Sequence, residues 1–136
     1  MKKEFSCDHI GLFTNNADRL INFYKKILKF KLISSERLQA NVVKALFKIK
    51  STACFYRLKS EDLLLEIFVP HSKKKTWKSI VRYGIHHFGM IVKNREEYIK
   101  NLRQKKVKII TLKRNGHKVY FIEDPDGNLI EIREAK

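Results

Sequence analysis

The sequence predicts an α+β fold made of two tandem modules, each with the order strand, helix and then about three strands (βαβββ). An internal repeat is the main reason: DHIGLFT at residues 8–14 returns as HHFGMIV at 86–92, and LLEI at 64–67 returns as LIEI at 129–132. Each copy of the first phrase precedes a helix-like stretch, and each copy of the second closes its module. Such a repeat indicates a duplicated unit, and one unit alone is too small to close a core.

Module one is expected to span residues 5–70. Its first strand is predicted at 6–13, where β-forming residues alternate with polar ones. Asn15 or Asn16 can cap the following helix, which runs to about Leu28 and has apolar residues at steps of three and four on one face. The next extended stretches are predicted at 30–37, 42–49, 53–58 and 63–69.

Module two is expected to span residues 83–136, after a lysine-rich linker at 71–82. It repeats the order of module one. Asn-Gly at 115–116 and Asp-Gly at 126–127 are strong turn signals, because their second residues tolerate positive φ. The elements of this module are predicted as a strand at 85–92, a helix from 95 to about 105, and strands at 108–112, 118–123 and 129–133.

The composition indicates a single soluble domain with a basic surface. Of the 136 residues 43% are hydrophobic, and 30 Lys and Arg against 14 Asp and Glu give a net charge of +16. Because no zinc-finger, helix-turn-helix or RNA-recognition pattern accompanies this charge, we expect a solvated surface or a field that steers a small anionic substrate, and no specific nucleic-acid partner. Cys7 and Cys54 lack metal-type spacing, and neither a signal segment nor a membrane-spanning run is found. We expect a cytoplasmic protein that does not bind membranes.

The repeat also aligns side chains that can carry chemistry. It pairs His9 with His87 and Glu66 with Glu131, so each module places one imidazole and one carboxylate at equivalent positions. A carboxylate in an otherwise apolar strand is costly to bury without a cation or a proton, although Glu66 taken alone could face solvent. Two imidazoles and two carboxylates suit a divalent ion. The sequence therefore predicts a metal site with these four residues as ligands.

Strand periodicity selects between the two adjacent histidines of module two. Side chains alternate between the faces of a strand, so one face holds both His9 and Gly11 in module one. In module two the same rule places His87 with Gly89 and points His86 to the other surface. The glycines leave room beside each imidazole for a bound water or a substrate.

Three features resemble the vicinal oxygen chelate superfamily of glyoxalases, extradiol dioxygenases, acyl-CoA epimerases and fosfomycin or bleomycin resistance proteins. They are the paired modules with their His-hydrophobic-Gly phrases, EDPDGNLIE at 123–131, and FYKKIL at 23–28. The resemblance spans essentially residues 5–134 and implies that the two modules curve into an incomplete mixed β-barrel, with the helices outside, around a divalent metal. The ligands that it implies are His9, Glu66, His87 and Glu131.

This set of two His and two Glu most resembles lactoylglutathione lyase of the glyoxalase I type. The resemblance implies zinc or nickel, with cobalt, manganese or iron as alternatives, and a reaction that converts a 2-oxoaldehyde–thiol hemithioacetal to a 2-hydroxyacyl thioester through an enediolate. Glu131 would be the catalytic base and Glu66 its partner across the metal. Glutathione or another thiol would be the cosubstrate, and a homodimer is expected. Phe13 and Thr14 occupy the region where glutathione-dependent members usually carry an arginine, which leaves the thiol open.

Other members of the superfamily supply alternatives. An acyl-CoA epimerase-like reaction or a fosfomycin-type thiol transfer is one, and His9, His87 and Glu131 alone would also satisfy a three-ligand site of the dioxygenase type. A drug-sequestering binding protein of the bleomycin resistance type, without catalysis, is an alternative of another class.

Overall fold

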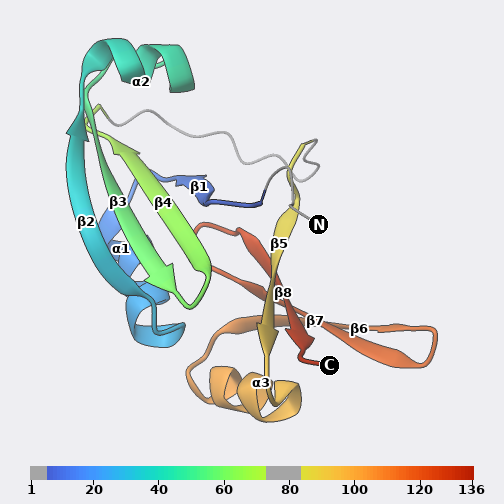
Figure 1. The fold of residues 1–136 in the computed structure, drawn as a ribbon. Helices are drawn as coiled ribbons and strands as arrows, with labels where there is room; N and C mark the ends of the chain where they lie inside the picture. The colour runs from blue at the N-terminus through green and yellow to red at the C-terminus, as the bar shows by residue number, and fades with distance from the viewer. Residues whose placement is uncertain (1–5, 73–83) are drawn as a thin grey trace. The chain divides into compact units, whose positions relative to one another are not determined.

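The computed structural model describes residues 6–72 and 84–136 (Figure 1). The chain forms two compact units, one on each side of residues 73–83, and most of the predicted linker at 71–82 lies outside the described residues. Each unit carries one four-stranded sheet in which one neighbouring pair of strands is parallel and the others are antiparallel, and neither sheet closes into a barrel by itself. The α+β class with two tandem modules is confirmed. Within the described residues, no helix has the length and apolar character needed to cross a membrane.

The sheet of module one has the strand order β1-β4-β3-β2. Its first strand runs parallel to its fourth, whereas the other neighbours are antiparallel. The first strand is shorter than predicted, so residues 6–9 precede it. The strands are β1 (Ile10–Phe13), β2 (Lys31–Leu38), β3 (Ala53–Ser60) and β4 (Leu63–Pro70).

The predicted first helix and its cap are confirmed. Helix α1 (Ala17–Asn22) begins after Asn16, whose side-chain oxygen accepts a hydrogen bond of 3.1 Å from the backbone N–H of Arg19. It continues into a π-helical segment, η1 (Phe23–Ile27), and covers one face of the sheet (Figure 1). The fully buried side chains of this module include Leu20, Tyr24, Leu58, Leu65 and Ile67.

The extended stretch predicted at residues 42–49 is wrong. The structure has a helix there, α2 (Ala40–Phe47), and the ring of Phe47 stacks on Phe13 with the centroids 4.5 Å apart and contacts Phe68 at 5.3 Å. The β-branched residues of this stretch favour a strand locally, but in the helix the Phe47 ring meets two aromatic rings of the sheet. The C-terminal end of α2 therefore contacts the sheet through Phe47.

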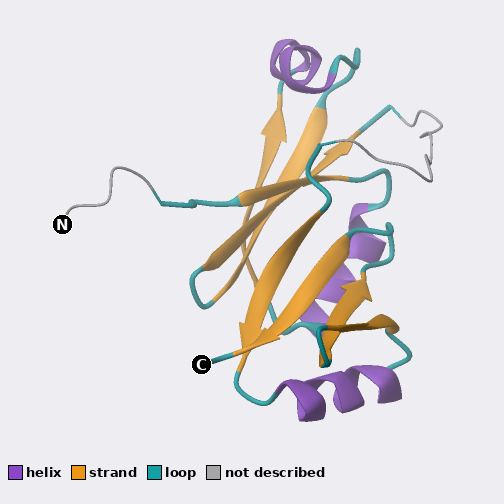
Figure 2. Cartoon of the chain, turned by 90° about the vertical axis from the view of Figure 1, so that its right-hand side faces the viewer, coloured by secondary structure: helices purple, strands orange, loops and turns teal. Residues whose placement is uncertain are grey.

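Module two repeats the strand order as β5-β8-β7-β6, with its first strand again parallel to its last. Its helix packs on one face of the sheet through Ile99 and Leu102 (Figure 2). The predicted elements are confirmed to within about two residues at each end. They are β5 (His87–Val92), α3 (Arg95–Gln104), β6 (Lys108–Arg114), β7 (His117–Glu123) and β8 (Leu129–Glu134).

Two turns fix the register of the last strands. Asn115 and Gly116 both have positive φ, as the predicted hairpin between β6 and β7 requires. Before β8, the buried Asp124 accepts hydrogen bonds from the backbone N–H groups of Asp126 and Asn128, both at 2.9 Å. The Asp124 carboxylate therefore stabilises this turn, and the turn sets which residues of β8 face away from α3.

Candidate functional site

In module one, His9 and Glu66 face one another. His9 lies just before β1, and β1 runs beside β4 with Gly11 directly opposite Glu66. The Nε2 atom of His9 is 3.7 Å from Oε1 of Glu66, and the two side chains are 41% and 10% exposed. Because Glu66 is nearly buried among apolar strand residues, its negative charge must be balanced by its neighbours. The structure therefore brings these two predicted site residues together within the module.

Asp8 orients the imidazole of His9. Its Oδ2 atom lies 2.7 Å from Nδ1 of His9, on the side of the ring away from Glu66. A carboxylate in this position accepts a hydrogen bond from the Nδ1–H group. The other ring nitrogen, Nε2, then carries no proton and can bind a cation. The repeat aligns Asp8 with His86, so each candidate histidine is preceded by a side chain that can accept a hydrogen bond. This alignment could have identified the orienting role of Asp8 from the sequence.

Module two contains the same pair. His87 opens β5, and β5 runs beside β8 with Gly89 opposite Glu131. The Nε2 atom of His87 is 3.6 Å from Oε2 of Glu131, and the side chains are 35% and 23% exposed. Nδ1 of His87 lies 2.8 Å from Nδ1 of His86, so one ring donates to the other. When His87 is the donor, His86 accepts the hydrogen bond from Nδ1 of His87 and orients that ring, as Asp8 orients the ring of His9 in module one.

Arg57 is a neighbour of Glu66 that the sequence analysis missed. Strands β3 and β4 place Arg57 directly opposite Glu66, and its Nε atom lies 3.5 Å from Oε1 of that carboxylate. This Nε is buried and has no hydrogen-bond partner among the described residues, so the contact is an ion pair without hydrogen-bond geometry. In module two the residue opposite Glu131 is Phe121, whose ring meets that of His87 edge to face at 4.9 Å. The two carboxylates therefore differ in their cross-strand neighbour.

Each His–Glu pair fits a shared divalent ion. Two ligand atoms bound at about 2.1 Å in a tetrahedral site lie about 3.4 Å apart, a few tenths of an ångström less than the observed nitrogen-to-oxygen separations of 3.7 and 3.6 Å. Imidazole nitrogen and carboxylate oxygen are also the donors that zinc, nickel and related ions accept. Among residues 6–72 and 84–136, no group of three or more His, Cys, Asp and Glu side chains is gathered closely enough to hold an ion. Each module thus supplies two candidate ligands, and the four-ligand site stays a prediction.

The remaining histidine of module one has other partners. His71 follows β4, and its Nδ1 lies 2.6 Å from Oγ1 of Thr52, while its Nε2 lies 3.3 Å from Sγ of Cys54. These contacts tie the end of β4 to the start of β3 and do not involve Glu66. His71 is therefore not part of the candidate site.

Comparisons with known proteins identify the family and the fold of the chain. The family model of the Glyoxalase/Bleomycin resistance protein/Dioxygenase superfamily matches residues 6–132. None of the curated proteins matches the chain.

Several solved structures share the fold. A glyoxalase family protein from Enterococcus faecalis is 22% identical, with 93% of this chain and 95% of that chain covered and a TM-score of 0.71. The trypanothione-dependent glyoxalase I of Leishmania major is 22% identical, with 96% and 87% covered and a TM-score of 0.68. A lactoylglutathione lyase from Agrobacterium tumefaciens is 17% identical, with 98% and 96% covered and a TM-score of 0.66. At these identities the likeness shows the fold.

Proposed function

The chain belongs to the Glyoxalase/Bleomycin resistance protein/Dioxygenase superfamily, and we propose that it is a metal-dependent isomerase or lyase of the glyoxalase type. The observation that carries this proposal is the same His–Glu pair at equivalent positions of both modules, with separations of 3.7 and 3.6 Å. The proposed ligands are His9, Glu66, His87 and Glu131, brought to one ion within a chain or across a homodimer. The substrate would be a hemithioacetal of a 2-oxoaldehyde with glutathione or another thiol.

In this proposal the residues of the site have two roles, the orientation of the histidine ligands and the transfer of a proton. A bound divalent ion supplies a Lewis acid that polarises a substrate oxygen. Asp8 holds the ring of His9 with Nε2 outward, and His86 can do the same for His87. One carboxylate would take the proton from the carbon that bears the thiol and return it to the former carbonyl carbon, while the hydroxyl proton passes to the former carbonyl oxygen, so the overall reaction is an isomerisation.

Glu131 is the better choice for this base. The Glu66 carboxylate lies beside the guanidinium of Arg57 at 3.5 Å, whereas the residue opposite Glu131 is the uncharged Phe121. The ion pair restrains the Glu66 carboxylate, whereas no cross-strand charge restrains that of Glu131. Glu131 is also more accessible, with 23% of its side chain exposed against 10% for Glu66.

Metal content tests the proposal. The full chain, purified without a metal-chelating tag from metal-replete medium, should carry about one divalent ion per site, and His87→Ala should lose it. His71→Ala is the matched control, because His71 contacts Thr52 and Cys54 instead of a candidate ligand. Isomerase activity is then measured with methylglyoxal and a panel of thiols. A metal-free wild-type protein, or a metalated protein that converts none of the hemithioacetals, would overturn the proposal.

The Arg57–Glu66 ion pair favours a second candidate function. If Glu66 stays with Arg57, the ion has the three ligands His9, His87 and Glu131, the set expected for a thiol transferase of the fosfomycin type. Glu66→Gln distinguishes the two: loss of metal supports four ligands, and full retention supports three. A protein that binds no metal but binds a drug-like ligand would instead be a sequestering protein. We further propose a cytoplasmic homodimer, which sedimentation of the full chain and cell fractionation would check.

A further inference from the structure

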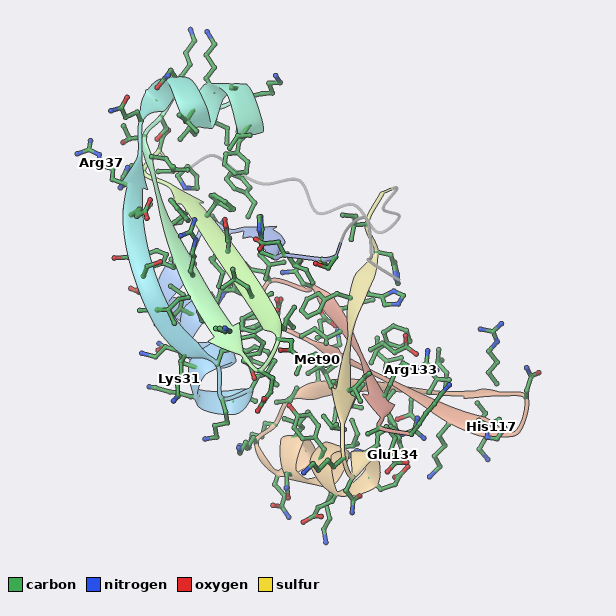
Figure 3. All side chains as sticks on the ribbon, viewed as in Figure 1. Lys31, Arg37, Met90, His117, Arg133 and Glu134 are labelled. Atoms are coloured by element: carbon green, nitrogen blue, oxygen red, sulfur yellow. The ribbon has the colours of Figure 1, made fainter. Side chains whose placement is uncertain are left out.

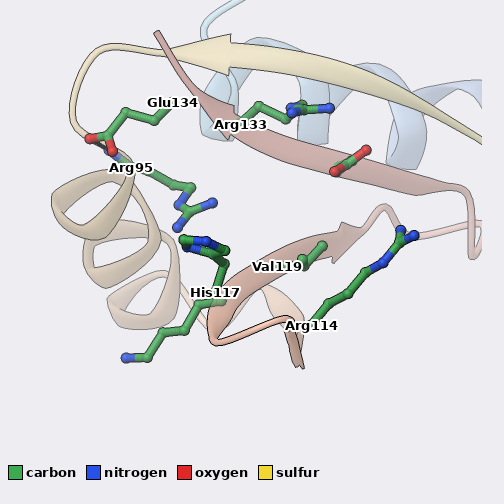
Figure 4. A pocket seen from close by; sticks show the side chains of 8 residues that line it. Arg95, Arg114, His117, Val119, Arg133 and Glu134 are labelled. Carbon is green, nitrogen blue, oxygen red and sulfur yellow. Dashed lines mark hydrogen bonds between the residues drawn. The ribbon is translucent and has the colours of Figure 1, made fainter. Parts of the chain in front are cut away.

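Module two has a cleft of about 380 Å³ that includes Glu131 and is otherwise lined by residues without a part in the proposed chemistry. Arg95, Arg114, Lys118 and Arg133 bring four fixed positive charges to its walls, and His117 adds an imidazole. Figure 4 shows Arg95 and His117 close together on one side, with Arg114 on the other side of the opening. The volume is at the lower end of the range for small-molecule sites.

The cleft exists because two strands stop pairing. The ladder between β7 and β8 extends only from Tyr120 opposite Ile132 to Glu123 opposite Leu129. Beyond it, the end of β8 still pairs with β5, and the start of β7 still pairs with β6. Both walls are therefore held by other strands, and the β6–β7 hairpin projects past β8 (Figure 1).

The β6–β7 hairpin carries one pair of like charges beside the cleft. Lys113 lies directly opposite Lys118, and the next pair places Arg114 opposite His117. Like charges in directly opposed strand positions destabilise a hairpin. Figure 3 shows His117, Arg133 and Glu134 in the part of module two where β7 and β8 separate. Of the two lysines only Lys118 lines the cleft, so an anion bound there would offset this repulsion through Lys118.

Arg95 is held in position but keeps an unused donor. Its guanidinium carbon lies 5.0 Å from the centre of the Tyr120 ring, and the hydroxyl of Tyr120 in turn donates to Glu96 at 2.8 Å. The Nε of Arg95 is buried and finds no hydrogen-bond partner among the described residues. The contact with the Tyr120 ring therefore holds the guanidinium in one orientation at the cleft wall, where it can donate to an incoming acceptor.

We propose that this cleft binds a phosphate group. The carboxylates of Glu131 and Glu134 also line it, so a singly charged anion gains less there than phosphate, which carries a charge of about −1.5 to −2 near pH 7. The cations come from α3, β6, β7 and β8. Donors that approach from several elements suit a tetrahedral oxyanion better than a planar carboxylate. One arginine guanidinium can also donate two parallel hydrogen bonds to two oxygens of a phosphate.

The position of Glu131 connects the cleft to the proposed reaction. Glu131 lines the cleft and also faces His87 at 3.6 Å. A ligand with its phosphate in the cleft would therefore have its other end beside the proposed base. The idea that the phosphate belongs to the substrate of the proposed reaction rests on the proposed function. Phosphate binding by the cleft does not depend on that function.

The test uses inorganic phosphate as the probe and the full chain kept metal-free with EDTA. Binding is followed by calorimetry or amide chemical shifts at constant ionic strength, with succinate as the dicarboxylate arm. The variant Arg114→Gln with Arg133→Gln removes two cations from opposite walls. Lys100→Gln with Lys105→Gln removes the same charge from exposed positions of α3 and its C-terminal end, outside the cleft.

Saturable phosphate binding that weakens about tenfold or more in the cleft variant and less than about twofold in the control supports the proposal. Non-saturable binding, or equal weakening in both variants, would show that phosphate affinity depends only on the net charge of the protein. Either result would overturn the proposal. Succinate binding as tightly as phosphate would overturn the phosphate assignment. Because the probe needs no metal, an intact phosphate site in a protein that never binds metal would refute the proposed reaction and leave the cleft assignment standing.

Discussion

Arg57→Met is expected to change metal affinity and the stability of the metal-free protein in opposite directions. The Arg57 guanidinium is the cation that balances Glu66, with Nε and Oε1 3.5 Å apart. If Glu66 binds the ion in the four-ligand site, the ion must take the carboxylate away from Arg57. Removing Arg57 abolishes this competition, and it also leaves Glu66 nearly buried without a cation when the metal is absent.

The magnitude follows from the separation and the exposure. Two unit charges 3.5 Å apart interact by about 5 kcal/mol at an effective dielectric constant of 20 and about 1 kcal/mol in bulk water. Because the Arg57 side chain is 39% exposed, solvent screens the pair, and we take about 1–2 kcal/mol. Arg57→Met should therefore bind zinc or nickel about tenfold more tightly and, without metal, should be less stable by about 1–2 kcal/mol.

Two assays check this prediction. Competition against a chelator of known affinity gives the metal affinity, and urea unfolding in EDTA gives the free energy of unfolding. Arg37→Met is the control, because it removes the same charge from an exposed position of β2 in the same sheet (Figure 3). Unchanged metal affinity in a destabilised Arg57→Met protein would mean that Glu66 does not bind the ion, and the four-ligand proposal would fail.

Three further substitutions test separate parts of the molecule. Asp8→Ala should weaken metal binding about 10- to 100-fold in the same competition assay by releasing the adjacent imidazole, whereas Asp62→Ala in the exposed β3–β4 turn should not; equal affinities would contradict the orienting role. Tyr120→Phe, which loses the hydrogen bond to the partly exposed Glu96, should lower the free energy of unfolding in urea by about 1 kcal/mol. Burial raises the pKa of Tyr98, so stability should be fully present below pH of about 10, the ordinary tyrosine pKa, and fall as the pH rises further. Tyr98→Phe should flatten this fall in thermal unfolding, and identical pH profiles would refute the assignment.

The sequence predicted what depends on local periodicity and on the repeat. Strand alternation singled out His87, which the structure places beside Glu131, but it also placed His86 on the other surface, whereas the ring of His86 lies against that of His87. The helix at residues 40–47 was missed because β-branched residues favour a strand locally, while the stacking of Phe47 on Phe13 is a tertiary contact. Arg57 was missed for a related reason: its position opposite Glu66 depends on the register of β3 on β4, which sequence periodicity does not give.

Register also explains how a duplicated site can assign different roles to its two carboxylates. The repeat gives Glu66 and Glu131 the same strand position and an imidazole at nearly the same distance. What differs is the residue directly across the next strand, Arg57 in one module and Phe121 in the other. The ion pair with Arg57 restrains the Glu66 carboxylate, which suits a ligand, whereas no charged side chain lies directly across the strand from Glu131, which suits a base that must move a proton. The proposed division between ligand and base therefore arises from one cross-strand substitution, with the ligand residues themselves unchanged.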